Sequence, residues 1–143
     1  MPHPLTDFFL PLSEAAEFIE ATLADTPAID IGFGPVLIYP FPRNKITAPL
    51  VPLANEPICV LFSLLRWAPS ADPAVAADLV AKNRIVFEGV RDIGGKRYSI
   101  GSVELSYADW IGHFGPKWPL FLAQKLIHDP KNTLTPGQHI FPW

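Results

Sequence analysis

The sequence predicts an α+β fold, in which an antiparallel sheet carries helices on one face and a helical tail follows. Apolar and β-branched runs at residues 8–10, 36–39 and 58–65 have the length and composition of strands. Two longer segments, 13–25 and 72–93, repeat apolar residues at helical spacing. The resulting order, β-α-β-β-α, is that of a ferredoxin-like unit with its helices on one face of the sheet.

The first strand and helix occupy the N-terminal end. Residues 8–10 form a short apolar run between Asp7 and Pro11. Ser13 is a candidate N-cap, because its hydroxyl can accept a hydrogen bond from a free N–H of the first turn. We expect the helix to end near Asp25, ahead of Pro27. Its apolar face is predicted to consist of Ala15, Phe18, Ile19 and Leu23.

Prolines bound the next two strands. The run at 36–39 is expected to stop at Pro40 and Pro42, because proline has no N–H for a strand ladder. A proline-containing loop then leads into the strand at 58–65, which is apolar except for Ser63. Cys59 is the only cysteine, so an internal disulfide is excluded and a small core residue is expected.

The second helix has start and stop signals at both ends. Asp72 followed by Pro73 is typical of an N-cap and a first helical residue. Gly94 and Gly95 end the helix, and Gly94 is expected to adopt a left-handed backbone. Its apolar stripe is predicted to contain Val75, Leu79, Val86, Val90 and Ile93.

A helical segment is expected beyond Tyr98, where the composition changes. Ser106 and Asp109 suit a capped short helix, Pro116 suits the start of another, and Asp129 with Pro130 closes it. The last residues, 135–138, fit a type II turn that presents Gln138 at its exit. We therefore expect two parts: an α+β domain over residues 1–105 and a helical segment over residues 106–143.

Composition and charge exclude several classes of protein. The net charge is −3 and lysine and arginine do not cluster, so binding to nucleic acid or to anionic membranes is not expected. The longest apolar run, 58–65, is far shorter than the roughly 20 residues of a membrane span. The N-terminal residues contain no export signal, so a cytoplasmic location is expected. Only 17% of residues are charged, against roughly 25% in average proteins, which predicts an apolar surface that meets a partner.

Motifs for self-contained chemistry are absent from the sequence. The four histidines are scattered, without the spacing that places two imidazoles on one metal, so no metal is expected. The sequence contains no G-x-S-x-G elbow, no phosphate loop and no G-x-G-x-x-G, because the pair Gly32 and Gly34 lacks the third glycine. We expect no catalytic residue and no nucleotide site within this chain alone.

A long combination of motifs near the C-terminus carries a family resemblance. Residues 110–115 read W-x-x-H-F-G, Trp118 follows, and then come Asp129-Pro130 and residues 136–138, P-G-Q. This order and spacing resembles the C-terminal end of plant and bacterial cytokinin dehydrogenases, FAD-linked oxidoreductases of the vanillyl-alcohol-oxidase group. The upstream segments 3–7, 34–40 and 82–95 are also similar to that family.

The resemblance implies roles for individual residues. Gln138 matches a glutamine that lies against the flavin. Tyr98 is the candidate for a tyrosine beside the flavin, whereas a count without gaps from Gly94 to Trp110 places Ile100 and Gly101 at the family's Tyr-Leu pair. Asp7 matches an Asn/Asp position in the substrate cavity, and Thr135 is implied as a second substrate-binding position. Leu5 stands where the family has a tryptophan, which removes a flat wall for stacking an adenine. A turn role for Gln138 and a framework role for His113 are the structural alternatives.

The resemblance also implies what this chain lacks by itself. In the family, an N-terminal FAD-binding domain carries the histidine bonded to flavin and the aspartate that takes the substrate's amine proton. We therefore expect no bound FAD and no turnover from this chain alone. Two hypotheses stay open: a fragment or split subunit of a flavin oxidoreductase that works with a separate FAD-binding chain, or a non-catalytic binding module. An open sheet edge also predicts a homodimer.

Overall fold

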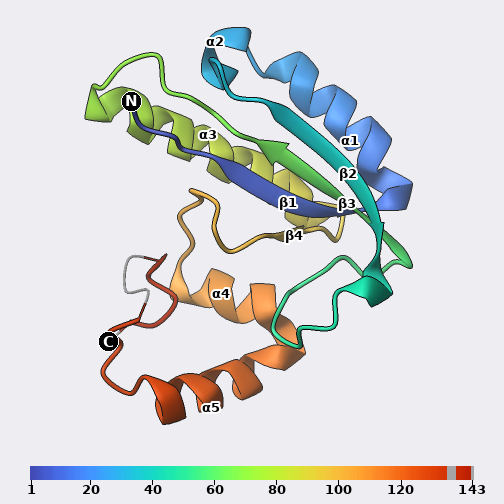
Figure 1. The fold of residues 1–143 in the computed structure, drawn as a ribbon, viewed down its shortest axis with the longest axis vertical. Helices are drawn as coiled ribbons and strands as arrows, with labels where there is room; N and C mark the ends of the chain where they lie inside the picture. Colours follow the sequence, from blue (N-terminus) through green and yellow to red (C-terminus); the bar gives the residue numbers. More distant parts are fainter. Residues whose placement is uncertain (135–137, 143) are drawn as a thin grey trace. The chain divides into compact units, whose positions relative to one another are not determined.

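The fold is taken from a computed structural model, which describes residues 1–134 and 138–142. A four-stranded antiparallel sheet has the order β2-β3-β1-β4 (Figure 1). The strands are β1 (Thr6–Pro11), β2 (Val36–Pro42), β3 (Ile58–Leu64) and β4 (Lys96–Arg97). The α-helices are α1 (Leu12–Asp25), α2 (Ala28–Ile31), α3 (Pro73–Asp92), α4 (Tyr107–Phe114) and α5 (Trp118–His128), and two 3₁₀ turns are η1 (Arg43–Lys45) and η2 (Gly115–Lys117).

The chain forms two compact units. The first contains residues 1–47 and 53–103, with the whole sheet and α1 to α3. The second contains residues 48–52 and 104–143, with α4 and α5. The α+β class, the ferredoxin-like order and the helical C-terminal tail are thereby confirmed.

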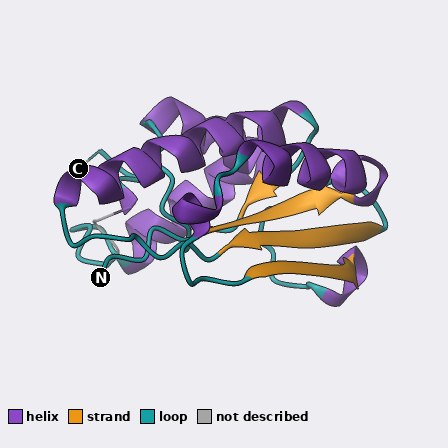
Figure 2. Cartoon of the chain, turned by 90° about the horizontal axis from the view of Figure 1, so that it is seen from above, coloured by secondary structure: helices purple, strands orange, loops and turns teal. Residues whose placement is uncertain are grey.

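One face of the sheet carries α1 and α3, and helices lie along one side of the orange strands in Figure 2. Phe8 of β1 points to this side, because its ring lies 6.4 Å from that of Phe87 in α3. Side chains alternate along a strand, so Asp7 and Phe9 point to the other side. The helices contribute buried residues of their apolar faces: Ala15, Ile19, Leu79, Phe87 and Val90.

Strand β2 continues through Pro40 and ends at Pro42, so the prediction that the run already stops at Pro40 is wrong. The N–H of Arg43 donates to Pro57 O and that of Leu65 to Pro35 O, so odd-numbered residues of β2 make the bonds to β3. Even-numbered residues direct their backbone outward. Pro40 and Pro42 therefore stand where no N–H is needed for the ladder.

The start of α1 also differs from its prediction. Pro11 is the N-cap and has no side chain that can cap the helix, so Ser13 is not the N-cap. The Ser13 hydroxyl instead donates to Glu56 Oε1 at 2.6 Å, from the loop before β3. The Ser13 hydroxyl, which the local sequence pattern assigned to the start of α1, is thus bonded to a carboxylate 43 residues away.

The predicted ends of α3 are confirmed. The Asp72 carboxylate accepts from the Ala74 N–H at 2.9 Å, with proline in the first turn. Gly94 has φ of 77°, the left-handed conformation expected at the end of this helix. The buried residues of α3 are Leu79, Asn83, Phe87 and Val90, so a polar side chain takes part in the buried face.

Two short elements were not predicted from the sequence. Helix α2 is a single turn. Strand β4 has only two residues, and it pairs with β1 at the edge of the sheet. Neither is long enough to show a period in the sequence, yet β4 completes the ferredoxin-like sheet.

Helices α4 and α5 of the second unit pack through aromatic rings. Ser106 and Asp109 form the predicted capping box at the start of α4. Pro116 lies in η2, so α5 starts at Trp118, two residues later than predicted. It ends ahead of Asp129, as expected. Ring contacts of 4.5–6.0 Å join Trp110, Phe114, Trp118, Phe121 and Phe141.

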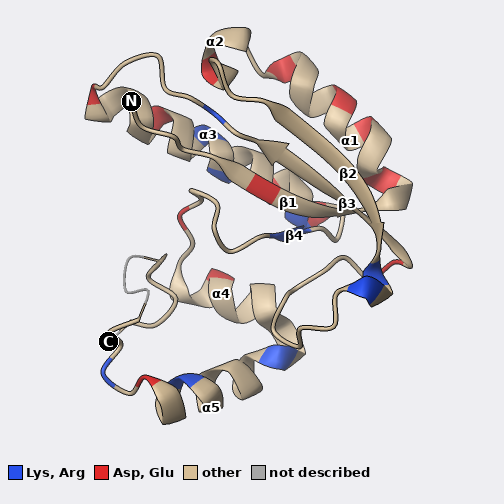
Figure 3. Cartoon of the chain, in the orientation of Figure 1, with Lys and Arg blue, Asp and Glu red and all other residues tan. Residues whose placement is uncertain are grey.

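Charged residues are unevenly distributed along the elements (Figure 3). Acidic side chains recur along α1, whereas β2 and β3 carry no charged residue. Of the helices in the described part of the chain, none combines the length and apolar character needed to cross a membrane. The described residues likewise contain no cluster of three or more His, Cys, Asp or Glu side chains placed to hold a metal ion.

Candidate functional site

The four residues implied by resemblance fall in different places. Asp7 lies in β1, and Tyr98 directly follows β4, so both belong to the first unit. Gln138 belongs to the second unit and is half-buried. Thr135 and the turn that includes it lie outside the described residues. The structure therefore brings Asp7 and Tyr98 together.

Asp7 and Tyr98 are part of one row across the sheet. Asp7 pairs with Ser63 of β3, and Ser63 pairs with Leu37 of β2. On the other side, the Tyr98 N–H donates to Asp7 O at 2.8 Å and continues the β1–β4 ladder by one residue. Paired residues share a face, so these four side chains lie on the face opposite α1 and α3. We call Leu37, Ser63, Asp7 and Tyr98 the distal row.

The centre of the distal row is a buried carboxylate. Asp7 is only 6% exposed, and Ser63 is fully buried. The Ser63 hydroxyl donates to Asp7 Oδ1 at 2.5 Å. The second oxygen, Oδ2, is buried without a hydrogen-bond partner among the described residues. Because a buried polar atom without a partner is costly, Asp7 Oδ2 marks a place where a donor from a ligand would be stabilising.

Aromatic rings adjoin this carboxylate. Phe9, two residues along β1, points to the same side as Asp7, and its ring lies 5.5 Å from that of Tyr98 and 5.7 Å from that of Phe41. Tyr98 remains 39% exposed, so part of its ring is free to contact another molecule. A carboxylate flanked by aromatic surface is suited to a flat ligand that carries an N–H group.

The segment that carries Tyr98 is held in place by a buried arginine. Arg97 is fully buried, and its Nη1 donates to Val103 O at 3.0 Å and its Nη2 to Gly101 O at 2.5 Å. Burial lowers the pKa of the Arg97 guanidinium to about 10. Gly101 packs against β1 so closely that a Cβ there would lie 3.2 Å from the Thr6 Cα. These contacts fix the segment from which Tyr98 projects.

Ser63 was not identified as a site residue from the sequence. Its signal was present, because Ser63 is the one hydroxyl in an otherwise apolar strand. A polar residue inside a buried strand needs a partner, but the sequence does not show that this partner is Asp7, 56 residues away.

The second unit holds Gln138 and His113. His113 is 6% exposed, with its ring 5.8 Å from that of Trp110 and 5.6 Å from that of Phe114, so it belongs to the aromatic packing of α4. These contacts agree with a framework role for this histidine. Gln138 carries an amide with both donor and acceptor atoms, which suits the edge of a ring with both.

Each of the two units has a residue that suits contact with a flavin ring, taken separately. Tyr98 offers partly exposed ring surface, and Gln138 offers an amide. The sequence contains no glycine-rich motif of the kind that holds a dinucleotide's pyrophosphate. Contacts to the rest of FAD would therefore come from elsewhere.

The sheet, the helix layer and the distal row together define a small α+β domain with a candidate ligand-binding face. Residues 1–141 match a family described as "Cytokinin dehydrogenase 1, FAD and cytokinin binding". This chain belongs to the cytokinin dehydrogenase family, and the matched region is the domain named for FAD and cytokinin binding.

Curated relatives agree with this assignment. An "Uncharacterized oxidoreductase ORF5 in fasciation locus" from Rhodococcoides fascians is 36% identical over 137 residues, covering 95% of this chain and 30% of that protein. Cytokinin dehydrogenase 8 from Oryza sativa subsp. indica is 35% identical and covers 99% of this chain and 29% of the rice protein. Cytokinin dehydrogenase 2 from Arabidopsis thaliana is 31% identical, covering 99% and 28%. The chain thus spans about 30% of the relatives' length.

Proposed function

We propose that this chain is the C-terminal, substrate-side part of an FAD-dependent dehydrogenase or oxidase, and that it is catalytically incomplete by itself. The observation that carries the proposal is the buried Asp7 carboxylate, of which only Oδ1 receives a hydrogen bond from the part of the chain that the structure describes. An N–H group of a substrate would supply the donor that Oδ2 lacks. Asp7 is then a binding residue that orients the substrate.

The other residues of the site have complementary roles in this proposal. The exposed part of the Tyr98 ring contacts a flat substrate or the flavin. For Gln138 of the second unit, the family resemblance implies a hydrogen bond from its amide to the flavin. FAD, when bound, supplies the acceptor for the electrons removed from the substrate. The chain's own residues bind and orient, because no group of theirs can accept a hydride.

The proposed substrate class is a cytokinin-like amine. This rests on the names of the relatives, which are cytokinin dehydrogenases, and on the N–H acceptor at Asp7. Leu5 replaces the tryptophan of the family, so an adenine would have to find its stacking surface on Tyr98 or Phe9 instead. Because of this substitution, the proposal includes a preference among amine substrates that differs from that of relatives with the tryptophan.

Complementation tests the proposal. The chain is mixed with the part of the Rhodococcoides fascians oxidoreductase that precedes its matched region, in the presence of FAD, and oxidation of an N6-alkyladenine is followed by flavin absorbance. We expect turnover only in the mixture. Asp7→Asn should lower kcat/KM at least about tenfold, since it removes a charge-assisted hydrogen bond. Turnover by the chain and FAD without a second polypeptide would contradict the proposal.

The second candidate is a non-catalytic binding or dimerisation module. Strand β2 forms one edge of the sheet and exposes Leu37, Ile38 and Tyr39 by 42%, 53% and 64%. On the side of β2 that faces away from β3, the backbone has N–H groups only at Val36 and Ile38, because Pro40 and Pro42 have none. A homodimer would therefore associate through these apolar side chains more than through an extended sheet.

Sedimentation velocity tests the dimer. The unchanged chain is expected to sediment as a dimer at micromolar concentration, whereas Ile38→Lys with Tyr39→Lys should sediment as a monomer. The matched control places lysine at exposed Ala16 and Ala24 of α1. A monomer at all concentrations would exclude the dimer and leave the first candidate function unaffected.

The cytoplasmic location expected from the sequence also stays a prediction, for which cell fractionation is the test.

A further inference from the structure

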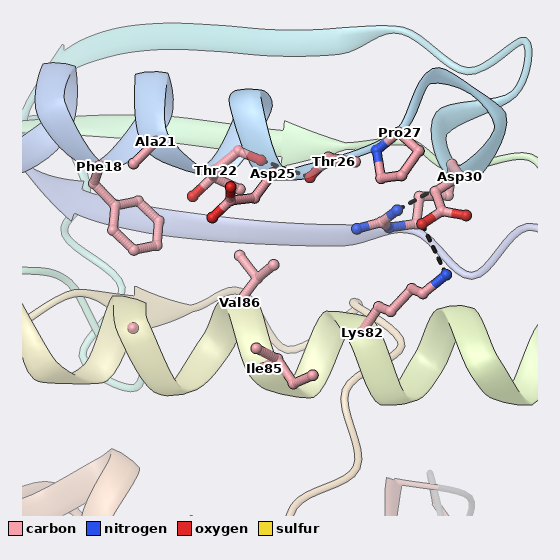
Figure 4. A pocket seen from close by; sticks show the side chains of 12 residues that line it. Phe18, Ala21, Thr22, Asp25, Thr26, Pro27, Asp30, Lys82, Ile85 and Val86 are labelled. Atoms are coloured by element: carbon pink, nitrogen blue, oxygen red, sulfur yellow. Dashed lines mark hydrogen bonds and ion pairs between the residues drawn. The ribbon is translucent and has the colours of Figure 1, made fainter.

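A cleft of about 490 Å³ opens between α1 and α3, on the face of the sheet opposite the distal row. Its apolar part is made by Phe18 and Ala21 of α1 and by Ile85 and Val86 of α3 (Figure 4). Gly89 leaves room for the Phe18 ring, because a Cβ there would lie 2.9 Å from Phe18 Cε2. The volume lies within the range of about 300–1,000 Å³ that is usual for small-molecule sites.

A buried arginine lies at the polar end of this cleft. Arg66, two residues after β3, is 1% exposed and lines the cleft. Its Nε donates to Asn83 Oδ1 at 2.8 Å and its Nη1 to Asp30 O at 3.1 Å. Nη2 makes no hydrogen bond within the described part of the chain. Both of the partners are neutral groups, so the guanidinium has hydrogen bonds but no carboxylate against it.

The carboxylates nearest to this arginine are already engaged. Lys82 Nζ lies 2.9 Å from Asp30 Oδ2 and 2.8 Å from Asp78 Oδ2, and the contact with Asp30 closes the polar end of the cleft (Figure 4). One lysine and two carboxylates carry a net charge of −1, which the Arg66 charge balances. The carboxylates nonetheless contact the lysine, and Arg66, which lines the cleft, keeps Nη2 without a hydrogen-bond acceptor among the described residues.

We propose that the α1–α3 cleft binds a small organic carboxylate with an apolar tail. The carboxylate accepts hydrogen bonds from Arg66 Nη2, and the tail lies along Phe18, Ile85 and Val86. A planar guanidinium is suited to a carboxylate, and the bond is strong because both groups are charged. The apolar tail removes Ile85, which is 72% exposed, from water.

Asp25 is the competing anchor at this cleft. It lines the cleft as an exposed carboxylate, and an organic amine would be the ligand that suits it. The observations favour the acid, because Asp25 is hydrated without a ligand whereas the open edge of Arg66 sits on a buried side chain. A comparison of acid, amide and amine with the same tail separates these cases.

Calorimetric titration of the 143-residue chain with octanoate, octanamide and octylamine is the first measurement. We expect saturable binding of octanoate and at least about tenfold weaker binding of octanamide, which cannot form the charged hydrogen bond. Equal affinity for octanamide would show that the carboxylate is not recognised. Tighter binding of octylamine would assign the cleft to Asp25, and no binding of octanoate would remove the site.

Two tryptophan variants locate the binding. Ala21→Trp fills the cleft from an exposed position on α1, and Ala24→Trp is the matched control on the same helix outside the cleft. Octanoate affinity should fall at least about tenfold in Ala21→Trp and stay unchanged in Ala24→Trp. Arg66→Lys, with folding verified by circular dichroism, should also weaken octanoate. Octanoate binding to Ala21→Trp as tight as to the unchanged chain would overturn the proposal. This outcome leaves Arg66 in place and is independent of whether Arg66→Lys folds.

Discussion

Ser63 and Asp7 face each other across the β3–β1 pair, and the serine hydroxyl donates to Asp7 Oδ1 at 2.5 Å within a fully buried setting. The bond supplies the one hydrogen-bond donor that this carboxylate has among the described residues, since Oδ2 has none there. The pair therefore combines a structural role with the candidate ligand site. Stability and ligand binding at this position are expected to be coupled.

Ser63→Ala should lower the free energy of unfolding by about 1–3 kcal/mol, because it leaves the Asp7 carboxylate buried without a donor. Urea unfolding followed by circular dichroism measures the loss. The double variant Ser63→Ala with Asp7→Leu serves as control and should lose less than the sum of the single variants, since it removes both polar partners. A Ser63→Ala chain as stable as the original would show that the bond contributes nothing.

Asn83→Leu should destabilise the chain by at least about 3 kcal/mol, because it breaks a buried network. The Asn83 side chain accepts from Arg66 Nε and donates to Pro4 O and Ser102 O. Asn55→Leu, at an exposed position, is the matched control and should change stability little. If both variants unfold at the same urea concentration, the network does not stabilise the first unit.

Ser106→Ala should weaken the start of α4 by about 1 kcal/mol, since the Ser106 hydroxyl caps the Asp109 N–H at 3.1 Å. Amide hydrogen exchange in α4 is the measurement, and faster exchange of the first-turn amides is expected. Ser13→Ala is the instructive comparison, because Ser13 caps no helix and contacts Glu56 instead. Unchanged exchange of the first-turn amides of α4 in Ser106→Ala would contradict the capping role of the Ser106 hydroxyl.

Ser13→Ala has its own expected effect, on Glu56. The hydrogen bonds from the Ser13 hydroxyl and N–H hold the pKa of the Glu56 carboxyl below its ordinary value. Removal of the hydroxyl should therefore raise the pKa of Glu56 toward that value, as measured by NMR titration. Glu14→Gln, which leaves both bonds in place, is the control, and an unchanged pKa of Glu56 in Ser13→Ala would refute the assignment.

Asp129 is expected to make the end of α5 sensitive to acid. The contact with Lys125, together with hydrogen bonds from Thr133 and Leu134, holds the pKa of the Asp129 carboxyl far below its ordinary value. Because the folded-state pKa is lowered, the stabilisation is present above the unfolded-state value of about 4 and is lost as pH falls below it. Protection of the Thr133 and Leu134 amides against hydrogen exchange, relative to the intrinsic rate at each pH, should fall below about pH 4, and Asp129→Asn should abolish this pH dependence.

Local patterns were sufficient where the partners lie close in sequence. Asp72 and Ala74, Ser106 and Asp109, and the left-handed Gly94 were all predictable, because each depends on a few neighbouring residues. Ser13 was misassigned for the complementary reason. Its partner, Glu56, lies 43 residues away, and a local rule cannot take such a partner into account.

The course of β2 shows the same limit. Proline normally ends a strand, so Pro40 was expected to do so. Whether a proline is tolerated depends on which backbone positions face the neighbouring strand, and this register is set only when β2 pairs with β3. In the same way, the pairing of β3 with β1 brings Ser63 to Asp7, and thereby makes the candidate site.

By itself, the sequence determined the α+β class and the family, and it predicted Asp7 and Tyr98 as site residues, because composition, spacing and motifs are properties of short stretches. Tertiary structure alone decided that Asp7 and Tyr98 stand side by side, that Ser63 joins them, and that Arg66 is buried beside Asn83. The physical reason is that buried polar groups must find partners, and packing brings those partners from distant parts of the chain.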